Sequence, residues 1–170
     1  ARILARMNPS GSLLLPPGPL DPAWVEREYN NRVLVPGHPA YFTRWEQDSD
    51  FVRQTLPSRL DLPYGPHPRQ RVDFFPARGS GRLLVFLHGG YWRGLDKRMF
   101  AWLAPSWVAE GVSVALVNYR LCPAVGIADI VDDAIAALNW IAIHAPVHGT
   151  GAQRIVVAGH SAGGHLAGAI

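Results

Sequence analysis

The chain has 170 residues, 48% of them hydrophobic, which is enough for one globular domain with a buried core and excludes a disordered or fibrous protein. Its formal net charge of +3 comes from Lys and Arg interleaved with Asp and Glu, so no polybasic block of the kind that binds nucleic acid or a membrane surface is present. The single cysteine, Cys122, cannot form an internal disulfide and favours a reducing compartment. We therefore expect a cytoplasmic protein.

The chain opens with a Pro-rich lead, residues 1–20, that we expect to be flexible and that lacks the apolar core and cleavage site of a signal peptide. No stretch of the sequence approaches the roughly 20 uninterrupted apolar residues of a membrane-spanning helix. Asp21-Pro22 and His38-Pro39 both have the pattern of a helix start. We predict that Asp21 caps a helix that begins at Pro22 and runs to about Val33, and that a second helix ends before Pro57.

Strand patterns begin further along the chain. A Pro-rich, extended stretch leads into a short candidate strand at 71–75, and Gly79-Ser80-Gly81 then predicts a turn. Residues 83–87, 112–117 and 155–158 are continuous apolar runs of strand length, which is typical of strands buried on both faces.

Helical spacing fills the gaps between these apolar runs. Residues 96–110 predict a helix that is bent or split at Pro105, and residues 127–141 predict a second helix that Pro146 closes. Strands joined by crossover helices run parallel to one another. We therefore predict that residues 61–170 form part of an α/β fold with a mostly parallel, doubly wound sheet.

The strongest chemical signal is Gly159-His160-Ser161-Ala162-Gly163, a G-x-S-x-G pattern directly after a buried strand and directly before a helix-forming stretch. A tight turn at this place holds the serine in a strained conformation, where flanking side chains larger than Gly would collide with neighbouring backbone. Ser161 is the predicted nucleophile. The helix that follows points its amino end at the reacting centre, and the Ala162 N–H is placed to receive an oxyanion.

A second signal lies at the carboxyl end of the 83–87 strand, where the sequence reads His88-Gly89-Gly90-Tyr91-Trp92. Two glycines allow this loop to fold back with its N–H groups facing inward. We predict the remaining oxyanion donors at Gly89 and Gly90, with Tyr91 as an alternative donor.

These two motifs, together with Val117-Asn118-Tyr119-Arg120-Leu121, resemble the hormone-sensitive-lipase branch of the α/β-hydrolases, and most of all its kynurenine formamidase (arylformamidase) and esterase group. The resemblance runs from about residue 24 to the end of the chain. It implies a metal-free enzyme that hydrolyses a small acyl substrate, with the helices of residues 21–60 roofing the active site. Tyr91 and Trp92 would then wall a flat aromatic pocket that also includes His160, although both could equally be ordinary core aromatics.

One departure from the resembled pattern concerns the catalytic triad. In this fold the acid and then the histidine base follow the serine in chain order, but the sequence ends at Ile170. We therefore expect a fragment of a longer enzyme, inactive alone, whose acid and base lie beyond residue 170.

None of the histidines present is a good substitute for that base. His160 precedes the nucleophile and should diverge from it, and His165 lies one helical turn further on, where packing or solvation is the better interpretation. His144 and His148 are four residues apart, but Pro146 between them prevents a helical metal pair.

The remaining titratable side chains have structural interpretations. His88 is predicted to brace its loop through a hydrogen bond, and Cys122 to be an unreactive loop or buried thiol. Asp129, Asp132 and Asp133 suit helix capping and the helix dipole better than acid catalysis.

The sequence thus predicts a serine hydrolase that acts on an aryl formamide such as N-formylkynurenine, or on a short carboxylic ester, without cofactor or metal. The expected partner is a small acyl substrate, with neither nucleic acid nor membrane. Formamide or ester remains open, as does the oligomeric state. The alternative is a hydrolase-fold protein that has lost its triad and binds a ligand or partner without catalysis.

Overall fold

The computed structural model describes residues 21–79 and 81–170, so the predicted flexible lead and Ser80 of the predicted turn lie outside the described residues. The chain divides after Tyr41 into two compact units. In the first, α1 (Pro22–Tyr29) begins as predicted, because the Asp21 carboxylate accepts from the Ala23 N–H at 3.1 Å. The predicted helix to Val33 is interrupted at Asn30, whose side-chain oxygen accepts from the N–H of Arg32 at 3.1 Å and starts α2 (Asn31–Leu34).

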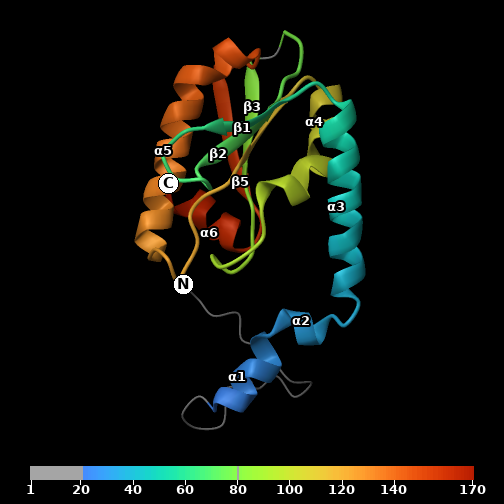
Figure 1. The fold of residues 1–170 in the computed structure, drawn as a ribbon, viewed down its shortest axis with the longest axis vertical. Helices are drawn as coiled ribbons and strands as arrows, with labels where there is room; N and C mark the ends of the chain where they lie inside the picture. The colour runs from blue at the N-terminus through green and yellow to red at the C-terminus, as the bar shows by residue number, and fades with distance from the viewer. Residues whose placement is uncertain (1–20, 80) are drawn as a thin grey trace, which may run out of the picture. The chain divides into compact units, whose positions relative to one another are not determined.

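The second unit is built on one mixed sheet, whose strands in the described part of the chain lie in the order β1-β2-β4-β3-β5 (Figure 1). Strand β3 pairs in parallel with both β4 and β5, as predicted, whereas β2 is antiparallel to β4 and β1 is antiparallel to β2. The stretch before β2 that was predicted to be merely extended therefore contains a strand. The bounds are β1 Arg59–Pro63, β2 Arg71–Phe75, β3 Arg82–Leu87, β4 Ser113–Val117 and β5 Arg154–Gly159.

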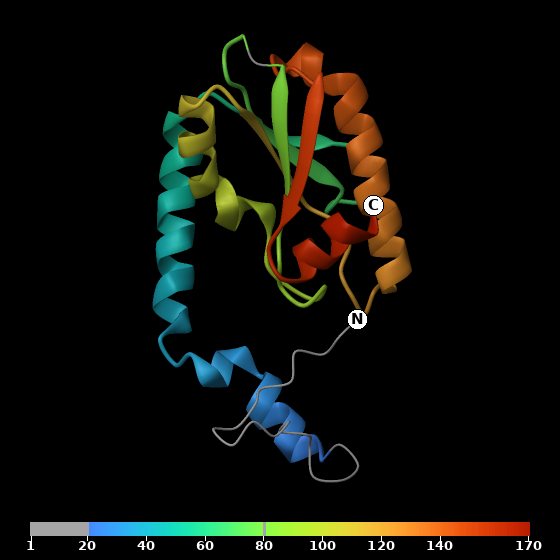
Figure 2. The same ribbon diagram turned by 180° about the vertical axis from the view of Figure 1, so that it is seen from behind.

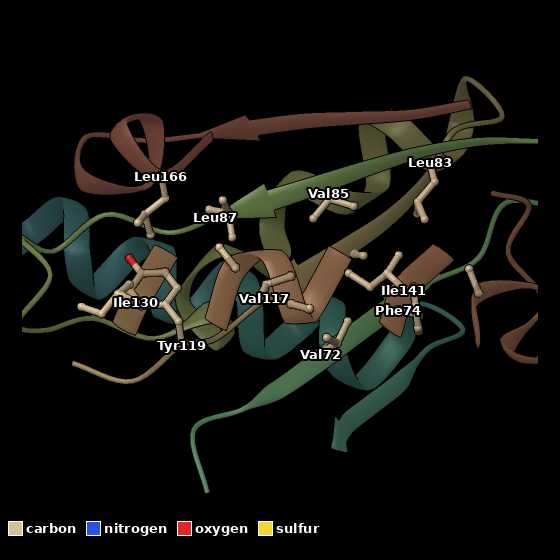
Figure 3. Packing of buried hydrophobic residues seen from close by; sticks show 14 residues of the cluster. Val72, Phe74, Leu83, Val85, Leu87, Val117, Tyr119, Ile130, Ile141 and Leu166 are labelled. Atoms are coloured by element: carbon tan, nitrogen blue, oxygen red, sulfur yellow. The ribbon is translucent and has the colours of Figure 1, made fainter. Parts of the chain in front are cut away.

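Helices cover both faces of this sheet, with α5 on one side and α3 and α4 on the other (Figure 1). Side chains alternate along each strand, so Val85 and Val117 pack toward α5 and α6, while Val114 and Leu116 pack toward α3 and α4. The bounds are α3 His38–Thr55, α4 Ala104–Ala109, α5 Ile127–His144 and α6 Ala162–Ala169. Figure 3 shows the larger core on the α5 side, with Val72, Phe74, Leu83, Val85, Leu87, Val117, Tyr119, Ile130, Ile141 and Leu166.

The two predicted crossover helices are present. The first is split near Pro105, as expected, into the 3-10 helix η1 (Lys97–Leu103) and α4. The second, α5, opens with the Gly126 N–H donating to the Asp129 carboxylate at 2.8 Å, which confirms the capping role of that aspartate. By length and composition α5 and the 3-10 helix after it could cross a membrane, and 33% of this window is buried, with Ile130 and Ile141 packed fully against the sheet.

The prediction that all three apolar runs are buried on both faces holds for β3 and β4 but is wrong for β5. Strand β4 lies between β2 and β3 and is buried throughout. Within the described chain β5 pairs only with β3, and Val156 on the face away from α5 is 54% exposed. A continuous apolar run therefore identified the strand but not the surface over it.

An ion cluster of Arg53, Asp61, Asp73 and Lys97, with Asp61 at its exposed end, joins α3, β1, β2 and η1, and the sequence did not predict it. The Lys97 ammonium contacts Asp61 at 2.5 Å and Asp73 at 2.6 Å, and Arg53 pairs with the other Asp73 oxygen. Asp73 and Lys97 are almost completely buried. Although burial opposes ionisation, the hydrogen bond from Lys97 and the charges of Lys97 and Arg53 hold the pKa of Asp61 below its ordinary value. The cluster fastens the carboxyl-terminal half of α3 to the sheet.

Candidate active site

Strand β5 turns sharply into α6 (Figure 2). Ser161 occupies this turn, as the sequence predicts. Its φ of 53° and ψ of −118° lie in a region that residues other than Gly rarely adopt. The turn is held by its neighbours, because the His160 N–H donates to the Leu87 carbonyl at 3.2 Å and the Gly163 N–H donates to the His160 carbonyl at 2.9 Å. The side chain of Ser161 is exposed at the carboxyl edge of the sheet.

The glycines of the G-x-S-x-G motif are required by backbone approach. A Cβ atom added to Gly159 would lie 2.1 Å from the Gly163 carbonyl oxygen, and one added to Gly163 would lie 1.9 Å from the Leu87 carbonyl oxygen. Real Cβ atoms do not come this close to backbone, so larger residues would force α6 away from β3. The two glycines allow the strand-to-helix turn to close.

The His88-Gly89-Gly90 loop reaches the serine. A Cβ atom added to Gly89 would lie 2.9 Å from the His160 carbonyl oxygen and 3.2 Å from the Ser161 Cβ. Gly90 has a φ of +113°, which only Gly adopts without strain. Among the described residues, no acceptor takes a hydrogen bond from the N–H of Gly89, Gly90 or Ala162. The three predicted oxyanion donors are therefore unpaired on two segments that meet at Ser161.

Aromatic rings contact the histidines on both sides of the serine in sequence. The ring of His160 is 6.4 Å from Trp45 of α3 and 6.4 Å from Phe100 of η1. The ring of His165 lies edge-on to Trp92 at 5.2 Å. The contribution of α3 and η1 was not predicted, because nothing in the spacing of Trp45 or Phe100 distinguishes a residue over the site from one in the core.

The two aromatic residues predicted to wall the pocket have different environments. Tyr91 is 74% exposed, whereas Trp92 packs against the core beside α6. Both have a φ of 56°, and the Arg93 and Gly94 N–H groups donate to the Gly90 carbonyl at 3.0 Å. The loop thus turns sharply at this point, and the ring centroids of Tyr91 and Trp92 are 5.6 Å apart. Their role in a substrate pocket remains a prediction.

The histidine that opens this loop is fully buried. Its Nδ1–H donates to the Gly89 carbonyl at 2.7 Å, which confirms the predicted bracing role. Its ring stacks on Tyr119 with centroids 4.4 Å apart. Burial above all, with the nearby Arg69 charge, lowers the pKa of His88 to about 4, although the hydrogen bond to Gly89 opposes this shift. His88 is therefore neutral at physiological pH.

This burial predicts acid sensitivity. Since the unfolded chain binds a proton at the ordinary histidine pKa of 6.5 and the folded chain only near 4, stability present above pH 6.5 is lost as the pH falls between these values. We expect the free energy of unfolding to fall by up to about 1.4 kcal/mol per pH unit in this window, measured by urea unfolding at successive pH values.

His88→Asn keeps a donor near the Gly89 carbonyl and should lose this slope, whereas His165→Asn, which changes an exposed ring, should keep it. The carboxyl groups of Asp61 and Asp133, whose pKa values are held below their ordinary range, contribute mainly at the acid end of this window and below it. An unchanged slope in His88→Asn would contradict the assignment.

No base for Ser161 is found in the described chain, where no histidine accepts from its hydroxyl. His144 stacks on Trp140 at 4.4 Å, and His148 lies 5.8 Å from the same ring, so both belong to an aromatic cluster at the end of α5. No group of three potential metal ligands occurs among the described residues.

Asp133 has a role that its position in the first turns of α5 did not predict. It is buried and accepts from the Arg120 guanidinium at 2.7 Å, from the Arg120 backbone N–H at 3.0 Å and from Gln70 at 2.9 Å. The carboxylate therefore ties the segment after β4 to α5 and takes no part in acid catalysis at Ser161.

The parallel strands, the crossover helices and the serine turn with a glycine loop beside it define an α/β-hydrolase. Within this class the chain belongs to the BD-FAE family, whose model matches residues 74–170. The match covers β3, β4 and β5 together with both motifs of the site.

Relatives and solved structures agree with this class. The chain is 37% identical to a kynurenine formamidase of Drosophila melanogaster over 62% of this chain and 35% of that protein, and 31% identical to a probable isoprenylcysteine alpha-carbonyl methylesterase of Arabidopsis thaliana over 64% and 24%. A candidate thioesterase structure from Silicibacter sp. TM1040 has 35% identity and a TM-score of 0.74, covering 85% of this chain and 54% of that one. The chain thus spans about a third or less of the two curated relatives and about half of that structure.

Proposed function

We propose that the protein containing this chain is a serine hydrolase that cleaves a small acyl substrate through an acyl-enzyme on Ser161. The observation that carries the proposal is the strained, exposed serine at φ 53° with Gly89 packed against it. Among the described residues the N–H groups of Gly89, Gly90 and Ala162 donate to no acceptor, and these residues belong to the two segments that meet at Ser161. Such a constellation suits acyl transfer, in which negative charge develops on one oxygen.

In the proposed mechanism the Ser161 hydroxyl oxygen attacks the acyl or formyl carbon, and a histidine outside this chain takes its proton. The carbonyl oxygen becomes an oxyanion that accepts hydrogen bonds from the loop and helix N–H groups. Collapse of this intermediate expels the amine or alcohol, which takes the proton from the histidine. Water then attacks the acyl-serine by the same route and releases the acid.

The names of the relatives favour two substrate classes. Kynurenine formamidases of Drosophila melanogaster and Danio rerio, at 37% and 29% identity, favour an aryl formamide. The methylesterases of Arabidopsis thaliana, at 31% identity, favour a carboxylic ester. Trp92 beside α6 and Trp45 beside His160 would offer flat apolar surfaces to the aryl group of a formamide or to the apolar part of an ester.

The test is a substrate panel on the full-length protein, with aryl formamides such as N-formylkynurenine compared with p-nitrophenyl acetate and butyrate. We expect hydrolysis of at least one class and covalent labelling by a fluorophosphonate probe that stops it. The ratio of kcat/KM values then assigns formamide or ester. A protein that neither labels nor hydrolyses any panel member, but binds one of them, would be the non-catalytic hydrolase-fold binder instead.

A further inference from the structure

We infer that Tyr119 is a positioning residue for the proposed hydrolysis: its hydroxyl fixes the peptide group that carries the Gly89 N–H, one of the oxyanion donors. The inference rests on the proposed function and extends it to a residue that follows a different strand from the one before the glycine loop. Tyr119 follows β4, whereas the loop it holds follows β3. It donates its O–H to the His88 carbonyl from a fully buried position.

Two consecutive peptide groups of the loop carry the Gly89 and Gly90 N–H groups. The peptide between His88 and Gly89 carries the His88 carbonyl, which accepts from Tyr119, and the Gly89 N–H. The peptide between Gly89 and Gly90 carries the Gly89 carbonyl, which accepts from His88 Nδ1 at 2.7 Å, and the Gly90 N–H. Both peptides are trans, so each N–H points away from its anchored carbonyl. The two anchors therefore turn both N–H groups away from the buried side of the loop.

The tyrosine hydroxyl is well suited to this task. Burial raises the pKa of Tyr119 well above its ordinary value, so the group stays a donor at neutral and moderately alkaline pH. The ring of Tyr119 also stacks on the ring of His88, with the two planes inclined by 12°. The two side chains that hold the loop carbonyl groups therefore pack against each other. The loop itself contains glycines and has little rotational restraint of its own, so its geometry depends on these contacts.

Arg69 contacts both Tyr119 and His88 and supports the same arrangement. Its Nε–H donates to the Tyr119 carbonyl at 2.9 Å, and a terminal N–H lies 3.5 Å from His88 Nε2. A donor at Nε2 keeps the His88 proton on Nδ1, the nitrogen that holds the Gly89 carbonyl. Arg69 also donates to the Leu95 carbonyl at 3.1 Å, which links the far end of the loop to the same guanidinium.

Tyr119→Phe in the full-length protein tests the inference, because it removes the hydroxyl and keeps the stacked ring. We expect kcat to fall about tenfold with KM within twofold, since the lost contact affects the oxyanion more than the bound substrate. The rate of fluorophosphonate labelling should fall in parallel. Arg69→Gln, which removes the donor to His88 Nε2, should change kcat in the same direction.

Tyr64→Phe is the matched control. The Tyr64 hydroxyl donates to the carbonyl of Asn118 at 2.7 Å, one residue before Tyr119, without contacting the loop. Its loss should lower stability to a similar degree and leave kcat within twofold. An unaltered kcat in Tyr119→Phe, an equal loss in Tyr64→Phe or a loss confined to KM would overturn the inference alone. A wild-type protein without hydrolase activity would overturn the proposed function, and this inference with it.

Discussion

Ser161→Ala should abolish hydrolysis and covalent labelling of the full-length protein. The hydroxyl is the group that bonds to the acyl carbon, so its removal leaves only substrate binding and oxyanion stabilisation. We expect a loss of roughly 10⁴- to 10⁶-fold in kcat, measured with the best substrate of the panel. Stability should rise or stay unchanged, because alanine at φ 53° has no larger steric cost than serine.

Ser106→Ala is the control for this substitution. Ser106 is an exposed serine on α4, away from the turn that holds Ser161. The control should retain full activity and labelling. Labelling of Ser161→Ala at the wild-type rate would place the nucleophile elsewhere in the protein and end the assignment.

The second large effect is expected for Gly163→Ala, which changes the packing of the turn between β5 and α6. A methyl group at position 163 would lie 1.9 Å from the Leu87 carbonyl oxygen and 2.6 Å from the His88 carbonyl oxygen, and both atoms belong to backbone that cannot rotate aside. Gly163→Ala must therefore push α6 off the end of β3. We expect the free energy of unfolding to fall by at least about 3 kcal/mol in urea titrations, with activity lost as well.

Gly168→Ala separates this steric effect from helix propensity. Gly168 lies on the same helix, and a Cβ there meets no atom within 4 Å. Alanine should raise stability by about 0.5 to 1 kcal/mol, because it restricts the unfolded chain more than glycine does. Equal destabilisation by both substitutions would show that α6 is sensitive to any change. It would contradict a specific steric clash between residue 163 and the backbone of Leu87 and His88.

Much of the fold was predictable from local pattern. Continuous apolar runs identified β3 and β4, and Asp21-Pro22 and Pro105 marked where helices begin or split. The serine turn was predictable because glycine is required wherever two backbone segments come too close for a side chain. A Cβ at Gly159 or Gly163 would collide with a backbone carbonyl oxygen.

Features that depend on partners distant in sequence were not predictable. The pairing of β1 with β2 was missed because Leu60 and Leu62 occur in a Pro-rich, polar stretch. The exposure of Val156 depends on which elements lie beside β5, and the sequence of the strand does not specify those neighbours. The contact of Trp45 with His160 depends on how α3 is held against η1.

The ion cluster of Arg53, Asp61, Asp73 and Lys97 constrains how this protein can vary. A single neutral replacement at Asp73 or Lys97 would leave the other buried charge with one partner fewer, whereas apolar residues of matching volume at both positions would leave Arg53 and Asp61 to pair with each other at 3.5 Å. We therefore expect homologous chains to keep the charges as a set or to exchange them as a set. A collection in which Asp73 and Lys97 change independently would show that α3 is anchored by other means.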